Sequence, residues 1–204
     1  MEDFDSVIKY SDKYLKLDKN NLNIYIHRAI ALLALQRDGE ALHYYDLVLN
    51  EDSENIYALV GRAHILLKLE KEDLFLECCE RILSIDPNNC HVLYYMSLYY
   101  FSLKQLDLAL KYINDSLDVD SYNLFALFLK ARILAKQGLF DDSLFILNGI
   151  LNILPENIDV LFFKALVLMD MEKNSEAKEC IDYILELDEN YSDALKIRDV
   201  LEER

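Results

Sequence analysis

Three of the four histidines are the residues whose type could most directly support metal binding or acid–base chemistry. His27, His64 and His91 lie far apart in the sequence. A metal site needs ligands that converge within a few ångströms, and neither an HExxH motif nor a paired Cys/His spacing brings these histidines together on one helix. We therefore predict that the chain holds no metal and no cofactor.

Motifs of enzymatic catalysis are also missing from the sequence. It contains no glycine-rich phosphate loop, no nucleophile elbow and no Asp-rich cation loop. Its many carboxylates are typical of solvated helix faces, so their number does not indicate general acid–base catalysis. We predict that the protein is not an enzyme.

The cysteines do not form a recognisable framework. Cys78, Cys79, Cys90 and Cys180 show no CxxC spacing, and two of them are adjacent. Adjacent cysteines rarely fit the geometry of a structural disulfide framework. We interpret all four as reduced thiols that pack in a core, as is usual in a cytoplasmic protein.

A column of cationic side chains recurs at intervals of 34 residues. Its members are Arg28, Arg62, Lys130, Lys164 and Arg198, and Met96 interrupts it. Such a column could bind anions. In so acidic a chain, however, cationic heads that pair with neighbouring carboxylates while their stems cover apolar surface are the better interpretation. We treat the column as structural.

Composition and charge narrow the class of protein. Of 204 residues, 53% are hydrophobic, and only four Gly and two Pro are present, which favours long helices joined by short loops. The net charge of −16 disfavours nucleic acid and anionic membranes as partners. The N-terminus lacks the basic start and apolar stretch of a secretory signal, and the apolar run from Val92 to Leu103 is too short to span a bilayer. We expect a cytoplasmic protein.

The positions of large and small residues repeat every 34 residues. Full repeats cover 22–55, 56–89, 90–123, 124–157 and 158–191 without insertion or deletion. The eighth place of each repeat is small, being Ala29, Ala63, Ser97, Ala131 and Ala165. The twentieth place is Ala41, Phe75, Ala109, Ser143 and Ala177. Small residues at these two places indicate a close crossing between two helices, and the apolar residues between them follow the helical period.

Asparagines mark the ends of the repeats. Asn21, Asn55, Asn89, Asn123 and Asn157 all precede a predicted helix, and a short side-chain oxygen there can cap the free N–H groups of that helix. Each repeat is therefore predicted to be an antiparallel helix pair.

This pattern resembles that of tetratricopeptide repeats. The small residues at places 8 and 20 and the Leu-x-x-Asp-Pro-Asn-Asn style ending, clearest from Leu83 to Asn89, carry the resemblance. It covers 22–191 fully, with 1–21 as an N-terminal half repeat and 192–204 as a C-terminal capping helix. The resemblance implies an all-α, right-handed superhelical solenoid in which 1–204 form one array. Phe75 departs from it, and we expect that helix crossing to be splayed.

The resemblance also implies which first-helix places line a concave surface. In this sequence they hold Ile26, Ile30, Leu33, Tyr57, Val60, Tyr94, Tyr95, Leu98, Phe101, Phe125, Phe128, Leu129, Arg132, Phe162, Phe163, Leu166 and Met169. A contiguous apolar patch of this size usually marks an interaction surface. The cationic clamp with which some family members hold acidic chaperone tails is missing, because Ile26 and Ile30 occupy its first Lys and Asn places.

These observations favour a scaffold or adaptor that holds an apolar or amphipathic peptide or helix in the concave groove. Tyr94, Phe101, Phe128 and Phe162 are the expected centre of binding, and the acidic surroundings favour a ligand with basic flanks. The alternative is a self-assembling structural protein that pairs through the N-terminal helix or the groove, because Phe4, Val7, Tyr10 and Tyr14 make that helix more apolar than a lid requires.

Overall fold

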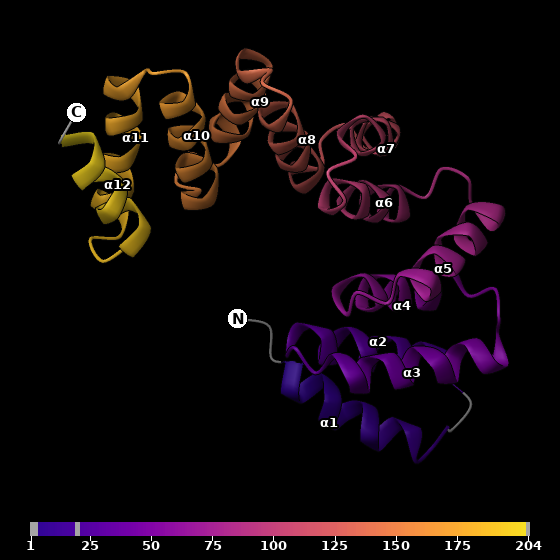
Figure 1. Ribbon diagram of the computed structural model, residues 1–204. Coiled ribbons are helices and arrows are strands. Elements are labelled where there is room, and N and C mark those ends of the chain that lie inside the picture. The colour runs from indigo at the N-terminus through magenta and orange to yellow at the C-terminus, as the bar shows by residue number, and fades with distance from the viewer. Residues whose placement is uncertain (1–3, 19–20, 203–204) are drawn as a thin grey trace. The chain divides into compact units, whose positions relative to one another are not determined.

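The computed structural model describes residues 4–18 and 21–202, and helices are the only regular secondary structure in those ranges. Within them, twelve helices follow one another along the chain (Figure 1). They are α1 (Phe4–Leu15), α2 (Leu22–Ala34), α3 (Asp38–Glu51), α4 (Ile56–Lys68), α5 (Glu72–Ile85), α6 (Cys90–Ser102), α7 (Leu106–Val119), α8 (Leu124–Lys136), α9 (Phe140–Ile153), α10 (Ile158–Asp170), α11 (Asn174–Leu187) and α12 (Ser192–Glu202).

The first helix of each repeat begins 34 residues after the previous one, from Leu22 in α2 to Ser192 in α12. The chain divides into two compact units, Met1–Tyr99 and Tyr100–Arg204, and the boundary falls within α6. Residues 1–3 and 19–20 of the predicted half repeat, and 203–204 of the predicted capping helix, lie outside the described residues. The assignment of 1–204 to a single array stays a prediction.

Asparagine side chains cap four of the first helices. Asn55, Asn123 and Asn157 accept hydrogen bonds from the backbone N–H groups of Ala58, Ala126 and Val160 at 3.0–3.2 Å. Asn89 accepts in the same way from Val92 at 3.2 Å. Asn21 makes no such bond, so the predicted cap of α2 is wrong. Its backbone carbonyl still accepts from the N–H of Ile24.

The turn inside each helix pair contains one residue with a left-handed backbone. Gln36, Glu70, Lys104 and Glu172 have φ of 54–60°, and Gly138 has φ of 80°. These five residues occupy the same place in the five repeats. Glycine adopts this conformation without steric cost, whereas other residues are strained there. The fourth repeat alone uses the residue type that suits the turn.

Small residues allow the paired helices to approach closely. Ala29 and Ala41 are fully buried between α2 and α3, and Ser143 of α9 donates its hydroxyl to the backbone oxygen of Ala131 in α8 at 2.8 Å. Phe75 is also fully buried, and its ring lies 5.4 Å from that of Tyr99 in α6. The expected splaying of this crossing stays a prediction.

Each unit has its own apolar core. In the first unit, Ile26, Leu32 and Val48 belong to a cluster formed by α2, α3 and α4. In the second, Leu161, Ile181 and Leu201 belong to a cluster formed by α10, α11 and α12. None of the helices in residues 4–18 and 21–202 combines the length and apolar character that a membrane span requires.

Candidate ligand-binding surface

Aromatic rings from α4 and α6 meet in the first unit. The ring of Tyr95 is stacked on His64, with centroids 5.3 Å apart, and contacts the ring of its neighbour Tyr94 at 5.9 Å. Partial burial and then the nearby Lys68 ammonium lower the pKa of His64. His64 is therefore a neutral stacking partner at neutral pH rather than a cation.

Tyr45 of α3 lies beside these rings because α4 leaves space for it at Gly61. A Cβ atom at Gly61 would overlap Cζ of the Tyr45 ring, because it would lie closer than real contacts allow. Burial, and then the proximity of Tyr95, raise the pKa of Tyr45 to about 12. Burial, and then Tyr94, raise the pKa of Tyr95 to about 12 as well. Both hydroxyls are uncharged at neutral pH, so this group of rings in the first unit presents apolar ring faces.

A second group of rings connects consecutive first helices of the second unit. Phe128 of α8 meets Phe163 of α10 edge-to-face at 5.7 Å, and Phe162 meets Tyr191, just before α12, at the same distance. The guanidinium carbon of Arg132 lies 5.2 Å from the centre of the Phe101 ring. We call Phe101, Phe128, Arg132, Phe162, Phe163, Leu166 and Tyr191 the aromatic cluster. Its members are half-buried, so parts of their surfaces remain accessible to a ligand.

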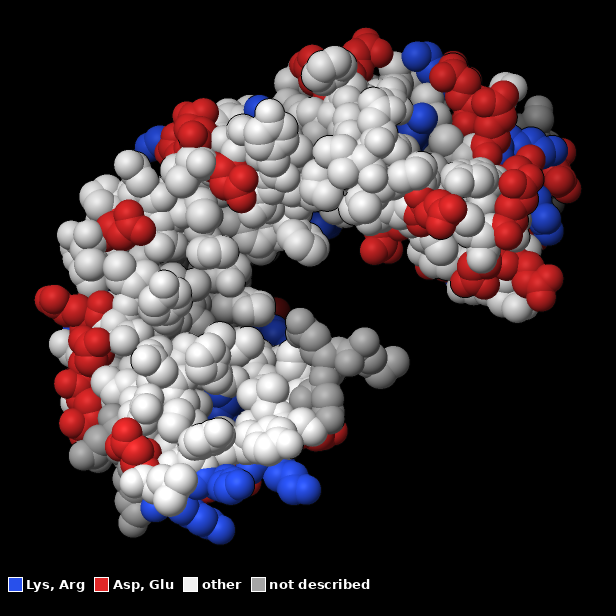
Figure 2. Space-filling view, turned by 180° about the vertical axis from the view of Figure 1, so that it is seen from behind, with Lys and Arg blue, Asp and Glu red and all other residues white. Residues whose placement is uncertain are grey.

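The aromatic cluster borders on negative charge. Burial, and then the carboxylates of Asp159, Asp193 and Asp188, raise the pKa of Tyr191. Figure 2 shows acidic side chains, with a few basic ones among them, gathered over the end of the chain formed by α11 and α12. A cationic group next to an apolar anchor would be attracted to this part of the unit.

Exposure separates the residues predicted to line a groove. Ile30, Tyr57 and Phe125 are exposed, whereas the remaining ones are half-buried with two exceptions. Ile26 is 7% exposed and Leu129 is 2% exposed, because both are packed in a core. We therefore leave Ile26 and Leu129 out of the proposed surface. The half-buried residues are Leu33, Val60, Tyr94, Tyr95, Leu98, Phe101, Phe128, Arg132, Phe162, Phe163, Leu166 and Met169.

Two arginines of the periodic column have structural partners. Arg28 of α2 donates to Ser11 Oγ at 2.9 Å and to the backbone oxygen of Ile8 at 3.2 Å, and it pairs with Asp12. Its guanidinium also lies 4.9 Å from the centre of the Tyr44 ring. These contacts tie α1 and α3 to α2, which supports the structural interpretation of this position.

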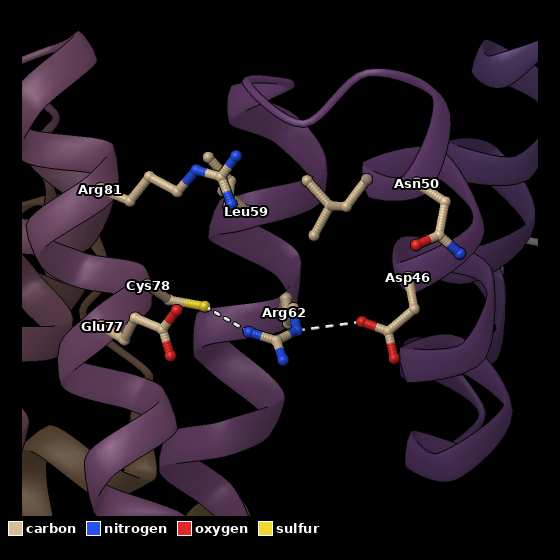
Figure 3. Close-up of a pocket in the computed structure, with 8 residues that line it drawn as sticks. Asp46, Asn50, Leu59, Arg62, Glu77, Cys78 and Arg81 are labelled. Carbon is tan, nitrogen blue, oxygen red and sulfur yellow. Dashed lines mark hydrogen bonds and ion pairs between the residues drawn. The ribbon is translucent and has the colours of Figure 1, made fainter.

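Arg62 of α4 lies between two helices in the same way. It donates to Asp46 of α3 at 3.0 Å and to Cys78 Sγ of α5 at 2.8 Å (Figure 3). These residues line a hollow of about 470 Å³, to which Glu77 and Arg81 contribute opposite charges. Burial raises the pKa of the Cys78 thiol, although the Arg62 guanidinium opposes this. A neutral, buried thiol suits packing better than nucleophilic chemistry.

The candidate metal ligands do not converge among the described residues. No group of three or more His, Cys, Asp or Glu side chains there could hold a metal ion. His27 lines a hollow beside α1, His64 stacks on Tyr95, and His91 is exposed at the start of α6. All four cysteines are free thiols, and Cys78, Cys79 and Cys180 are buried.

Sequence reasoning missed two features of these surfaces. Tyr191 replaces the asparagine that ends the other four full repeats, and this break in the column could have indicated its separate role. Tyr45 and Gly61 lie 16 positions apart in different repeats. Nothing in their local sequence predicts that a ring occupies the space of a missing side chain.

Family models match part of the chain. Residues 56–89 match a tetratricopeptide repeat, and residues 75–150 match subunit 3 of the anaphase-promoting complex, or cyclosome. No curated protein sequence gives a significant match.

Several solved structures have a similar fold. YrrB, described as a TPR protein with an unusual peptide-binding site, is 22% identical over 93% of this chain and 97% of its own, with a TM-score of 0.66. The TPR protein TTC0263 of Thermus thermophilus is 20% identical over 90% of this chain and 100% of its own, with a TM-score of 0.71. Yeast Tom70 is 21% identical over 96% of this chain and 42% of its own, with a TM-score of 0.73. These similarities confirm the prediction of an all-α helical repeat solenoid.

Proposed function

We propose that this chain, as a member of the tetratricopeptide repeat family, is a scaffold that binds an apolar peptide with basic flanks at its aromatic cluster. Members of this family bind peptides or proteins. The contacts Phe128–Phe163 and Phe162–Tyr191 carry the proposal, because they align half-buried rings across successive first helices. Large aromatic side chains contribute most of the binding energy at typical interfaces.

Charge supports the choice of ligand. Asp159, Asp188 and Asp193 surround Tyr191, and the whole chain carries a net charge of −16. Basic residues beside the apolar anchors would increase the association rate through long-range attraction. The same net charge disfavours nucleic acid as a ligand. The similar fold of YrrB, which is described as having a peptide-binding site, fits this class of ligand.

The first test uses ligands captured from a native lysate and identified by mass spectrometry, followed by calorimetric titration with a synthetic peptide from the captured protein. Phe128→Ser and Phe162→Ser should each weaken binding by roughly 2 kcal/mol while the helicity is retained. Tyr122→Ser is the matched control, because this exposed tyrosine lies in the loop before α8. Equal affinity of all three variants would show that the aromatic cluster is internal packing.

Self-association through the N-terminal helix is a second candidate, and one hollow favours it. Phe4, Val7, Tyr10 and Tyr14 of α1 line a hollow of about 440 Å³ together with residues of α2, including Ile30. Figure 2 shows a mostly uncharged surface over the N-terminal helices, with Lys and Arg gathered along its lower edge and a few acidic side chains beside it. An exposed apolar surface of this kind could pair with a second copy.

Light scattering distinguishes the two functions. A dimeric or larger mass that becomes monomeric in the Tyr10→Ser/Tyr14→Ser variant would establish self-association through α1. A monomer at all concentrations up to the solubility limit would exclude it and leave ligand binding as the function.

A further inference from the structure

The outer face of α9 differs from the rest of this acidic molecule. Phe145 is 80% exposed and Ile153 is 58% exposed, and Asn148, Gly149 and Asn152 lie exposed between them. No charged residue occurs between 143 and 155. We call Phe145, Asn148, Gly149, Asn152, Ile153 and Leu154 the α9 face. Exposed apolar side chains at a spacing that keeps them on one side of a helix indicate a surface that another element covers.

The second helices of the other four repeats, α3, α5, α7 and α11, do not have such an uncharged outer face. Each of them carries at least one exposed charged side chain beyond its first turn, which keeps its outer face solvated. They are Glu51 of α3, Glu77, Glu80 and Arg81 of α5, Lys111 and Asp118 of α7, and Glu179, Asp182 and Glu186 of α11. The α9 face is therefore a local departure from the repeat and not a property of the fold.

The residue after α9 departs from the repeat in the same way. Asp52 and Asp86 accept hydrogen bonds from the side-chain amides of Asn55 and Asn89 at 3.0 Å, and so stabilise the turn to the next helix. Leu154 occupies this place in the fourth repeat and is exposed. An apolar side chain has replaced a carboxylate with a structural role, and it extends the uncharged surface by one more residue.

Gly149 provides an independent observation. It lies in the interior of α9, where glycine makes a helix less stable than alanine does. A Cβ atom there would meet nothing within 4 Å, so no contact inside the molecule requires glycine. Gly61, in contrast, makes room for Tyr45. Gly149 lies one helical turn from both Phe145 and Ile153, so the helix backbone is bare between two apolar side chains. This arrangement permits close approach of a second backbone.

We propose that the α9 face binds a helix of another protein, one that presents small and apolar side chains to Gly149 and carries basic residues at both ends. Asp141 and Asp142 lie exposed at the start of α9, and Glu156 lies exposed just beyond its end. Carboxylates at both ends complement basic residues on a partner helix. A second copy of this chain is disfavoured, because an antiparallel α9 pair would bring Asp141 and Asp142 close to Glu156 of the other copy.

The test uses a dye-labelled helical probe peptide with alanine and leucine on one face and lysines at both ends, measured by fluorescence anisotropy. A twin peptide with glutamates at the ends serves as the charge control. The native protein should bind the lysine probe at least tenfold more tightly than the glutamate twin. Because this probe could also bind the aromatic cluster, the variants are compared in the Phe128→Ser background. There, Phe145→Ser and Gly149→Glu should each weaken binding of the lysine probe at least tenfold, while Tyr122→Ser leaves it unchanged.

Gly149→Ala separates binding from folding. The added methyl group meets nothing within 4 Å, and alanine loses less conformational freedom on folding than glycine does. The variant should therefore melt at a higher temperature than the native protein, yet it should bind the probe several-fold more weakly. Unchanged probe affinity in Phe145→Ser and Gly149→Glu would overturn the proposal. So would a loss confined to Phe128→Ser, which would assign the probe to the aromatic cluster. A native dimer that Phe145→Ser dissociates would also overturn it and assign the face to a second copy.

Discussion

At the scale of single residues, two glycines in helix interiors have opposite surroundings. Gly61 faces the buried ring of Tyr45, whereas Gly149 faces open space. The same residue type is therefore required by packing inside the molecule at one position, and by nothing inside the molecule at the other. Such a difference can be measured directly, because the two positions respond in opposite ways to an added methyl group.

Gly61→Ala should lower the free energy of unfolding by about 1–3 kcal/mol, because the new Cβ atom would overlap the Tyr45 ring. Urea denaturation at constant pH measures this change. Tyr45→Leu removes the ring atoms closest to the Cβ atom, so the double variant should lose less stability than the sum of the single variants. Strictly additive effects would show that the ring and the Gly61 backbone are not in contact.

Tyr45 and Tyr95 should make stability sensitive to alkaline pH. Their pKa values in the folded chain, about 12 each, lie above the ordinary value of 10. Between pH 10 and 12 the unfolded chain releases protons that the folded chain keeps. The stabilisation is complete below pH 10 and is lost as the pH rises toward 12. Across this pH range, the urea midpoint of Tyr45→Phe should fall less steeply than that of the native protein. The exposed control Tyr122→Phe should show the same fall as the native protein.

At the scale of the elements, asparagine caps and left-handed turns recur at the same places in the repeat. The caps satisfy N–H groups that have no partner within the helix. Asn21 stands at the same place without making the side-chain bond. Sequence position alone therefore does not guarantee the interaction, and the native chain contains its own negative control.

Asn123→Ala should cost about 1 kcal/mol of unfolding free energy, because it removes the bond to the Ala126 N–H group. Asn21→Ala should leave stability almost unchanged. Thermal melting of the two variants side by side provides the measurement. Equal losses would mean that asparagine acts through the backbone conformation at these positions and not through its side-chain oxygen.

At the scale of the whole molecule, stability depends on contacts between neighbouring helices. α1 supplies three acceptors to the partly buried Arg28 of α2, and Ile8 of α1 packs against the core formed by α2, α3 and α4. Repeat arrays are held together by such nearest-neighbour contacts, so the loss of an end helix destabilises the helix beside it.

Deletion of residues 1–17 should lower the melting temperature by about 5 °C or more, because Arg28 loses its partners and the core beside α2 becomes exposed. Differential scanning calorimetry measures the change. The control is the double variant Lys9→Ala/Lys13→Ala, which alters exposed charges of α1 but leaves its packing intact. A deletion variant that melts like the native chain would show that α1 does not support α2.

The sequence by itself determined the helices, the 34-residue period and the crossing places, because these depend on side-chain size at fixed spacing. It also indicated most of the aromatic residues that contact one another between first helices. Only the tertiary structure decided which apolar side chains a ligand can reach: Ile26 and Leu129 are buried, whereas Phe145 is exposed. Likewise, only the structure revealed that Tyr45 fills the space at Gly61. The physical reason is that exposure depends on the neighbouring helices, whose side chains are distant in sequence and settle together when the helices pack.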